Sequence, residues 1–535
     1  MAEPYYVDED VGKDDESASG TPTAPYKTLL HAMKSHSPET SKYMTRKAAA
    51  PGEQAEYKDA SASALKKAQK LYDQYKRKQD KNADLEIKAR EEEMKRLAIL
   101  EDAKKVIIEE DRSLPKAKKI RLDDTEDITL GNRAQKGTRI RVLGRVHRFR
   151  SQKDVIFVTL KDGYGQMQVV FGGQLIKTYA AMTLTLESSL EVKGELKELP
   201  EGASAPLKRE LHADFFRVIG AAAGDKEAIT NKVSKDADPQ TLLDQRHLAL
   251  RGDILSSVMK VRAAVLRAFR QAYLETRCLE VSPPSMVQTQ VEGGATLFGF
   301  KYYDQEAYLT QSSQLYLETC LASMGDVFCI CPSFRAERSL TRRHLAEYMH
   351  IEAELDFIAF DDLLAHLEKV ICRVIDIALS EPATAAHVKE LNPSFQRPTQ
   401  PFKRMRYADA IEWLNKHNID FEDEDESLPK DDPQRQIKRP HQFGDDIAEA
   451  AERRMTDILN VPIFLTHFPV EIKAFYMSRD PEDPRVTESV DVLMPGVGEI
   501  VGGSMRISDY DELMAAYTRV GIDAAPYYWY TDQRK

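Results

Sequence analysis

The spacing of apolar and polar residues changes twice along the chain. Residues 61–111 contain strong helix formers and neither Gly nor Pro, which predicts one or two long, charged helices that end at Ser113–Pro115. From Gly137 the apolar positions alternate with period two, as in half-buried strands. About five such strands with Gly-rich turns are expected, at 139–147, 155–160, 166–171, 190–196 and 211–219. This spacing is typical of an OB-type barrel, whose sheet face binds single-stranded nucleic acid.

A third pattern begins after an Ala-, Lys- and Asp-rich linker at 221–242. It predicts an α+β region with helices at 253–277, 361–380 and 445–459 and strands at 327–335, 347–356, 463–468 and 499–507. The expected fold class is therefore α+β. The expected domains are a small N-terminal extension, a charged helical arm, an OB-fold barrel, a linker and a large α+β domain, at 1–60, 61–115, 130–222, 223–245 and 246–535 respectively.

Charge is distributed unevenly over the 535 residues, whose formal net charge is −11. Between Lys66 and Arg90 there are nine basic and four acidic residues. A local positive stretch on an acidic protein indicates a nucleic-acid partner, although a solvated helix with internal ion pairs explains the pattern equally well. There is no run of 18 apolar residues to predict a membrane span, and the five cysteines, mostly in apolar runs, favour reduced thiols and the cytosol.

The segment 488–506 carries the strongest indication of chemistry. Asp491 and Glu499 flank a tight turn, and Gly498, Gly502 and Gly503 let a bulky ligand approach the backbone, while Arg506 follows seven residues after Glu499. Carboxylates that hold Mg²⁺, small residues and an arginine are what a site that activates a carboxylate with ATP requires. By itself, the segment favours a Gly-rich hairpin that has a surface ion pair, and the other segments below shift the interpretation.

Other segments supply complementary groups. Glu292 precedes a Gly pair in a loop, and Ser312 or Ser313 can cap a helix whose first turn presents Gln314. Arg335 and Glu337 lie on one face of a strand because the side-chain period is two. Together with Arg335, the basic loop 338–344 places four arginines and a histidine within ten residues. Such a cluster suits a triphosphate.

These residues resemble the class II aminoacyl-tRNA synthetases of the aspartyl, asparaginyl and lysyl subgroup. Phe334–Glu337 with its basic loop is similar to motif 2 of that class, the segment around Pro284 is similar to motif 1, and 137–220 is similar to the anticodon-binding barrel. From Pro4 to Lys535 the chain resembles the eukaryotic cytosolic asparaginyl enzymes. The resemblance implies an antiparallel-sheet catalytic domain, a cytoplasmic homodimer, and ATP-dependent ligation of asparagine to tRNA(Asn) with Mg²⁺.

The resemblance also implies a set of ATP and metal ligands. Arg335 would bind the α-phosphate and the substrate carboxylate, and Tyr348 would stack on adenine. Asp491 and Glu499 would hold Mg²⁺. The remaining ATP-site residues implied are Glu337, Arg343, His344 and Leu345, of which Arg343 and His344 would reach the outer phosphates and Glu337 the adenylate or the tRNA end.

A second implied set recognises the amino acid and the tRNA. In the barrel Phe157 would stack on an anticodon base and Gln168 would hydrogen-bond one, as unpaired RNA bases are read. On the arm, Lys76, Arg77 and Lys78 would contact tRNA. The implied amino-acid ligands are Glu292, Gln311, Ser313, Gln314, Arg335, Glu352, Gly502 and Arg506.

Two positions bear on asparagine against aspartate. Aspartyl enzymes of the subgroup carry lysine at the position of Leu317 and aspartate at that of Glu352. Our hypothesis is that Glu352 accepts a hydrogen bond from the asparagine amide and repels aspartate, while Arg506 donates to the amide oxygen. An aspartyl enzyme and a catalytically inactive tRNA-binding or signalling protein are the alternatives.

One departure from the family concerns its third motif. That motif is a Gly-rich strand ending in Glu-Arg, which this sequence does not contain. We therefore expect a truncated sequence whose core sheet lacks a central strand and whose ATP site lacks one phosphate ligand.

Overall fold

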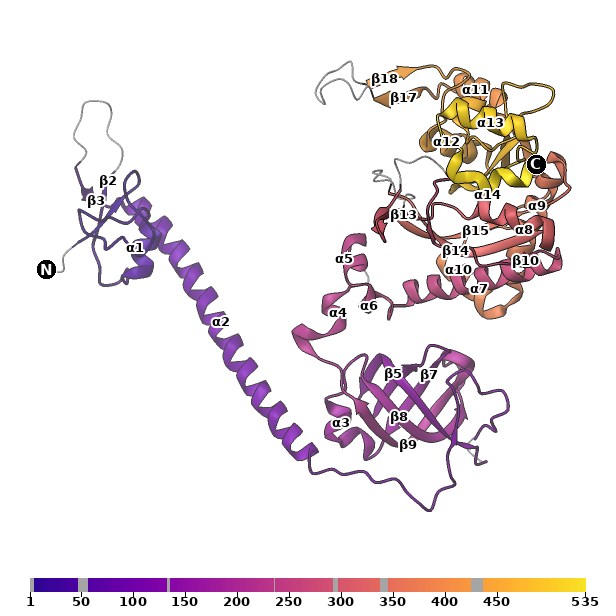
Figure 1. Ribbon diagram of the computed structural model, residues 1–535. Coiled ribbons are helices and arrows are strands. Elements are labelled where there is room, and N and C mark those ends of the chain that lie inside the picture. Colours follow the sequence, from indigo (N-terminus) through magenta and orange to yellow (C-terminus); the bar gives the residue numbers. More distant parts are fainter. Residues whose placement is uncertain are drawn as a thin grey trace. The chain divides into compact units, whose positions relative to one another are not determined.

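The computed structural model describes residues 4–46, 56–131, 135–234, 236–291, 297–336, 345–424 and 436–535. The chain forms two units, Met1–Ala237 and Asp238–Lys535 (Figure 1). Helices and largely antiparallel sheets occur in both, which confirms the predicted α+β class. Within the described part of the chain, none of the helices is long and apolar enough to cross a membrane.

The N-terminal module combines a three-stranded sheet with the start of a long helix. Strands β1 (Tyr5–Asp8), β2 (Tyr43–Arg46) and β3 (Lys58–Asp59) pair in that order, and helix α1 (Leu29–Ser35) packs beside α2 (Ala62–Ala103). The module's apolar cluster includes Ala68 on α2, so the first turns of α2 complete this core.

Helix α2 spans 42 residues but ends at Ala103, so the prediction that it ends at Ser113–Pro115 is wrong. The residues after it bind to the barrel instead. Ile108 packs against the barrel core, and the Glu110 carboxylate pairs with Arg139 and Lys193 of barrel strands. These tertiary contacts outweigh the helix propensity of the segment, which pattern alone could not reveal.

The barrel consists of β4 (Lys118–Lys119), β5 (Arg139–Gln152), β6 (Val155–Lys161), β7 (Gln166–Gly172), β8 (Ser189–Glu198) and β9 (Arg209–Gly220). The strand order is β4-β5-β6-β7-β9-β8, and an additional β5–β8 pairing closes the barrel. Burial alternates along β6 and β7, so every second side chain enters the core. The five strands predicted from alternation are thus confirmed.

The second unit contains two principal sheets. The first has the order β10-β14-β15, and the second has the order β16-β19-β20-β21. Their bounds are β10 (Leu279–Glu280), β14 (Val327–Phe334), β15 (Glu347–Glu354), β16 (Lys403–Arg406), β19 (Ile463–Thr466), β20 (Ser489–Met494) and β21 (Gly498–Ser504). Smaller sheets are made by β11 (Met286–Val287), β13 (Gln305–Leu309) and β12 (Gly299–Tyr302), and by β17 (Phe421–Glu424) and β18 (Gln436–Arg439).

Helices cover these sheets, and one of them contacts both. The apolar side chains of α9 (Phe360–Ser380) pack through Val370 and Val374 with α7 (Asp253–Glu275) and β14, and through Leu364 and Ile371 with the core of β19 and β20. The other helices described in this unit are α5 (Pro239–Asp244), α6 (Arg246–Ala249), α8 (Gln314–Met324), α10 (Pro382–Leu391), α11 (Tyr407–Lys416), α12 (Glu449–Leu459), α13 (Tyr510–Val520) and α14 (Tyr528–Thr531). The predicted helices and strands of this unit are confirmed to within a few residues.

A wide cavity separates the two principal sheets. Strand β15 ends one sheet and β21 ends the other, and among the described residues no strand pairs with these two facing edges. The cavity measures about 2220 Å³ and is lined from both sides.

Candidate functional site

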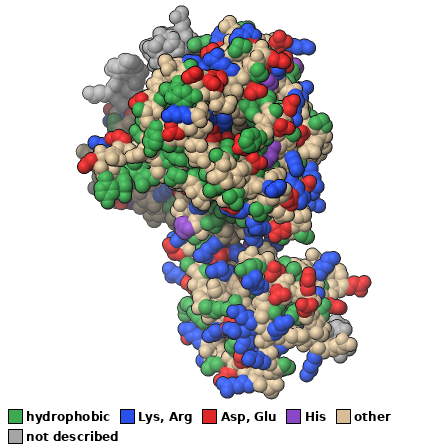
Figure 2. All heavy atoms as spheres, turned by 45° about the vertical axis from the view of Figure 1, so that its right-hand side comes forward, with side chains coloured by type: hydrophobic (Ala, Val, Ile, Leu, Met, Phe, Trp, Pro, Cys, Tyr) green, Lys and Arg blue, Asp and Glu red, His purple; other side chains and the backbone are tan. Residues whose placement is uncertain are grey.

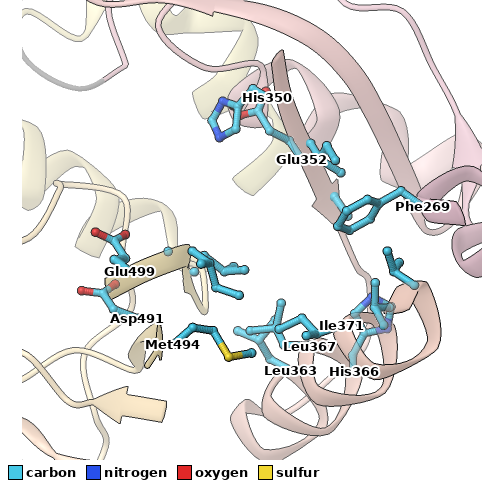
Figure 3. A pocket seen from close by; sticks show the side chains of 18 of the residues that line it. Phe269, His350, Glu352, Leu363, His366, Leu367, Ile371, Asp491, Met494 and Glu499 are labelled. Carbon is cyan, nitrogen blue, oxygen red and sulfur yellow. The ribbon is translucent and has the colours of Figure 1, made fainter. Parts of the chain in front are cut away.

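The cavity between β15 and β21 collects polar groups on an apolar floor (Figure 3). His350 and Glu352 stand on β15, and Asp491 and Glu499 come from the opposite sheet, on β20 and β21. The floor includes Leu363, Leu367 and Ile371 of α9, with Phe269 and Met494 nearby. The predicted residues that the cavity brings together are Gln314, Arg335, Tyr348, Glu352, Asp491, Glu499, Gly502 and Arg506.

Tyr348 lies on β15, and Arg335 lies directly after the neighbouring strand β14, which ends at Phe334. Arg335 follows β14, where its backbone N–H donates to the Ala346 carbonyl over 3.1 Å. Its guanidinium carbon lies 5.6 Å from the centre of the Tyr348 ring. A cation beside an aromatic plane suits a nucleotide whose phosphate and base are bound separately. Glu337, Arg343 and His344 are outside the described residues, and Leu345 is 59% exposed next to them.

The start of α8 is held by Glu352 from the facing strand. The Glu352 carboxylate accepts hydrogen bonds from the Ser312 hydroxyl and from the Ser313 backbone N–H, the latter at 3.0 and 3.1 Å. The Cys329 thiol lies 3.8 Å from the same carboxylate. Of the two serines expected to cap the helix, Ser313 makes no side-chain cap, but the Ser312 hydroxyl accepts a 3.3 Å hydrogen bond from the Gln314 N–H. The Glu352 carboxylate satisfies the Ser313 amide and suits the positive end of the helix.

Two glutamines near that helix end differ in their surroundings. The Gln311 side chain is buried and accepts a 3.2 Å hydrogen bond from the Val291 N–H. The Gln314 Nε2 is buried without a hydrogen-bond partner among the described residues, and the side chain lines the cavity. A buried unpaired donor is uncommon, so Gln314 is available to a ligand's acceptor. Glu292 lies outside the described residues.

Arg506 is the most enclosed cation of the site. Its Nη2 lies 2.6 Å from Glu354 Oε1, its Nε lies 3.4 Å from Glu318 Oε1, and its Nη1 donates to the Ser504 hydroxyl. Burial opposes the charge on Arg506, but Glu354 and Glu318 raise the pKa of the guanidinium above its usual value. Burial in turn raises the pKa of the Glu354 carboxyl to about 7, against the opposing effect of Arg506.

Glu318 and Glu354 were not predicted as site residues from the sequence. Glu318 stands one helical turn after Gln314, and this i, i+4 spacing is the signal in the sequence that places both on one helix face. Leu317 points elsewhere: it is fully buried in a cluster with Val327 and Cys329 and does not line the cavity. An effect of Leu317 on substrate choice would therefore be indirect.

Asp491 and Glu499 converge on Gly502. A Cβ atom placed on Gly502 would lie 3.2 Å from Glu499 Oε1 and 3.6 Å from Asp491 Oδ1, so the glycine leaves a notch between the two carboxylates. Burial raises the pKa of Asp491, and Lys473, whose Nζ lies 2.8 Å away, opposes this effect. No group of three or more potential metal ligands exists among the described residues. Two carboxylates nevertheless fit Mg²⁺, which is commonly held by one or two carboxylates together with substrate phosphates and water.

A second face suited to ligands lies on the barrel. Phe157 on β6 is half-buried and pairs in register with Arg150, whose guanidinium carbon is 4.7 Å from the ring centre. Gln168 is a diagonal neighbour of Phe157 on β7, and its Nε2 donates to the Glu210 carboxylate over 3.1 Å. Figure 2 shows numerous blue Lys and Arg side chains over the barrel. An aromatic ring, an amide and cations on one sheet face suit unpaired RNA bases.

The side chains of Lys76, Arg77 and Lys78 are exposed on α2, beyond the part of the helix that packs against α1. They are free of the module core and accessible to a polyanion.

Comparison with known protein families agrees with this geometry. The family described as tRNA synthetases class II (D, K and N) matches residues 238–535, which is more than half of the chain. The chain belongs to this family. The family Asparaginal-tRNA synthetase, N-terminal domain, matches 21–115, and the OB-fold nucleic acid binding domain matches 140–219.

Individual relatives extend the similarity over nearly the whole chain. The cytoplasmic asparagine--tRNA ligase of Saccharomyces cerevisiae is 51% identical over 530 residues, covering 99% of this chain and 92% of the relative. That of Homo sapiens is 47% identical over 537 residues, covering 100% and 92%. The Entamoeba histolytica asparaginyl-tRNA synthetase in complex with asparaginyl-adenylate superposes with a TM-score of 0.69 and 42% identity, covering 79% of this chain and 90% of that one. The expectation of a truncated sequence is not borne out by these comparisons.

Proposed function

We propose that this chain ligates asparagine to tRNA(Asn) in the cytoplasm, using ATP and passing through an asparaginyl-adenylate. The observation that carries the proposal is a single cavity lined by Arg335, Gln314 and Arg506 together with the Asp491 and Glu499 pair. It occurs in a chain that is 47–51% identical to cytoplasmic asparagine--tRNA ligases over nearly its full length. The aspartyl enzyme and the inactive tRNA-binding protein are therefore not favoured.

The first step joins asparagine to AMP. A carboxylate oxygen of asparagine attacks the α-phosphorus of ATP, the bond to the bridging oxygen breaks, and pyrophosphate leaves. Arg335 binds both the attacking carboxylate and the α-phosphate, so it positions the reactants and stabilises charge in the transition state. Asp491 and Glu499 would hold Mg²⁺, which when bound neutralises phosphate charge. Tyr348 would stack on adenine.

The second step transfers the acyl group. A hydroxyl of the terminal ribose of tRNA attacks the carbonyl carbon of the adenylate, its proton passes to the departing phosphate or to water, and AMP leaves. Neither step requires a covalent intermediate with the protein. The side chains named therefore act by positioning and by electrostatic stabilisation alone.

Side-chain recognition is assigned to Glu352 and Arg506. Arg506 would donate to the amide oxygen of asparagine, and Glu352 would accept from the amide nitrogen. Glu352 already accepts from Ser312 and Ser313, so its orientation is fixed before asparagine binds. If Glu352→Gln keeps the wild-type preference for asparagine over aspartate, this role is wrong.

The tRNA would be bound at two places. Phe157 would stack on an anticodon base and Gln168 would hydrogen-bond one, and Glu210 already holds the Gln168 amide in one orientation. Lys76–Lys78 on α2 would add contacts to phosphates that carry no sequence information.

We also propose a homodimer through the region that resembles motif 1. Large apolar side chains are exposed there on α7, β10 and β12. They are Ile254 and Leu274, each 67% exposed, Leu279 at 50%, Phe300 at 37% and Tyr302 at 52%. Monomeric proteins seldom expose such a set together. Sedimentation equilibrium tests the proposal: a species of twice the chain mass supports it, and a monomer at micromolar concentration contradicts it.

The deciding experiment for function is ATP–pyrophosphate exchange with asparagine, with aspartate as the comparison substrate and Arg335→Gln as the control variant. Asparagine-dependent exchange that Arg335→Gln abolishes supports the proposal. Exchange with aspartate instead identifies an aspartyl enzyme. A folded chain that binds tRNA and exchanges with neither amino acid is a tRNA-binding protein.

A further inference from the structure

Four buried charged side chains pair with one another at the end of the cavity: Glu318, Glu354, Arg506 and Arg534. Glu318 on α8 lies between two arginines: Arg506, with Nε at 3.4 Å from its Oε1, and Arg534, whose Nη2 bonds its Oε2. Glu354 lies on the other side of Arg506 at 2.6 Å. All four side chains are at most 19% exposed.

The set contains as many carboxyl groups as guanidinium groups, so its charges cancel when both carboxyls are ionised. Two guanidinium cations face two carboxylates, and the Tyr530 hydroxyl adds a neutral donor 2.9 Å from Glu318. A buried arginine whose charge is not balanced by neighbouring carboxylates attracts a ligand carboxylate far more strongly than a ligand amide. An arginine whose charge is balanced by two carboxylates keeps its N–H donors but loses the long-range attraction for an anion.

From this arrangement we propose that Glu318 is a specificity-determining residue, which acts through Arg506 to favour a neutral side-chain amide over a carboxylate. The proposal deepens the proposed function, on which it rests. Without the charge on Glu318 the set would carry one excess positive charge beside the substrate, and aspartate would gain more than asparagine.

The position of Glu318 supports a direct influence on substrate choice. It lies one turn after Gln314 on the same face of α8, and both side chains line the cavity. Glu352, two residues before Glu354 on β15, adds another carboxylate near Glu354 and also disfavours an anionic side chain. Leu317, between Gln314 and Glu318 in sequence, does not line the cavity.

The test compares asparagine with aspartate in Glu318→Gln and Glu318→Asp. The ratio of kcat/KM for asparagine over aspartate, from pyrophosphate exchange, should fall at least about tenfold in Glu318→Gln, which corresponds to about 1.4 kcal/mol. Glu318→Asp keeps the charge and should recover most of the wild-type ratio. An unchanged ratio in Glu318→Gln overturns the proposal.

Two matched variants separate charge from structure. Glu368 is a buried carboxylate that also pairs with an arginine, Arg404 at 3.1 Å, but it does not line the cavity. Glu368→Gln should keep the wild-type ratio whatever it does to stability. Tyr530→Phe removes a hydrogen bond to Glu318 without removing its charge and should also keep the ratio. A fall in either variant as large as in Glu318→Gln overturns the proposal.

Two further measurements keep the test decisive. If Glu318→Gln does not fold, Glu354→Gln removes the same charge from the other side of Arg506, and a wild-type ratio there overturns the proposal. Calorimetric titration of asparagine and aspartate gives the ratio of affinities without turnover. A wild-type chain that binds asparagine but does not catalyse exchange refutes the proposed function alone, whereas one that binds neither amino acid refutes both.

Discussion

Glu452 allows a prediction in which the pH dependence of stability is worked out from one buried group. It lies on α12, is 9% exposed, and belongs to the same half of the catalytic unit as Asp491 and Glu499. Burial first, and then the charges of Asp491 and Glu499, raise the pKa of the Glu452 carboxyl to about 8. Glu452→Gln replaces the carboxyl with a neutral group of the same shape.

The magnitude follows from the two pKa values. The folded protein holds this proton up to about pH 8, whereas an unfolded glutamic acid releases it near 4.5. As pH rises between those values, ionisation favours the unfolded chain, so wild-type stability falls across this window. At about 1.4 kcal/mol for each tenfold change in proton affinity, the loss is about 3 kcal/mol at pH 7 and nearly 5 kcal/mol above pH 8. Glu452→Gln should therefore be as stable as wild type near pH 4.5 and about 3 kcal/mol more stable at pH 7.

Urea unfolding in EDTA at pH 4.5, 6, 7 and 8 measures this difference. Trp413 packs against the apolar cluster that contains Ala451 and Met455 of α12, so its fluorescence follows the unfolding of the core to which the helix of Glu452 belongs. The control Glu412→Gln changes an exposed glutamate on α11 and should leave the pH profile unchanged. Parallel stability curves for wild type and Glu452→Gln at every pH would refute the reasoning.

Three further predictions concern ligands. Gly502→Ala should raise the Mg²⁺ concentration required for half-maximal exchange by about tenfold, because the added methyl group enters the notch between two carboxylates. Gly503→Ala is the control and should leave this concentration unchanged, because its Cβ would lie at an ordinary 3.6 Å from Val490. Replacing Lys76, Arg77 and Lys78 with alanine should weaken tRNA binding and reduce the steepness of the plot of log binding constant against log salt concentration by about 2. Replacing Glu91–Glu93 on the same helix with glutamine is the control and should not weaken binding. Phe157→Leu should cost about 1–3 kcal/mol in affinity for an anticodon stem-loop, measured by fluorescence anisotropy, with no effect on pyrophosphate exchange.

Each of these has a contradicting result. Equal Mg²⁺ requirements in the two glycine variants would place the cation elsewhere. An unchanged salt slope after removal of the Lys76–Lys78 charges would show that the arm does not contact phosphates. Loss of exchange in Phe157→Leu, with anticodon affinity retained, would remove the barrel face from tRNA recognition.

Much of the fold follows from periodicity. Alternation along β6 and β7 and the helix formers of α2 reflect local rules, so both types of element were predicted from sequence. The end of α2 was not, because Glu110 finds its partners Arg139 and Lys193 tens of residues away. Local pattern carries no information on such contacts.

The candidate site shows the same division. Arg335 and Arg506 were predicted as site residues because the sequence segments that contain them resemble those of a known family. Glu318 and Glu354 were missed, since their importance arises from a charge balance that exists only after α8, β15 and the segment after β21 have come together. The contribution of Glu352 to the cap of α8, beside that of Ser312, is a second case, because a capping carboxylate from a strand distant in sequence has no spacing to identify it.

The helix α9 contacts both principal sheets, whose facing edges are separated by the cavity. Contact is also made at one end of that space, where Arg506 meets Glu354 and where Leu315 of α8 packs with Phe475 and Ile507. Each half-sheet has its own apolar cluster, so opening one half need not expose the core of the other. Hydrogen exchange should then resolve two cooperative blocks in the catalytic unit, one with β14 and β15 and one with β19 and β20, and a ligand that spans the cavity should merge their protection into a single event.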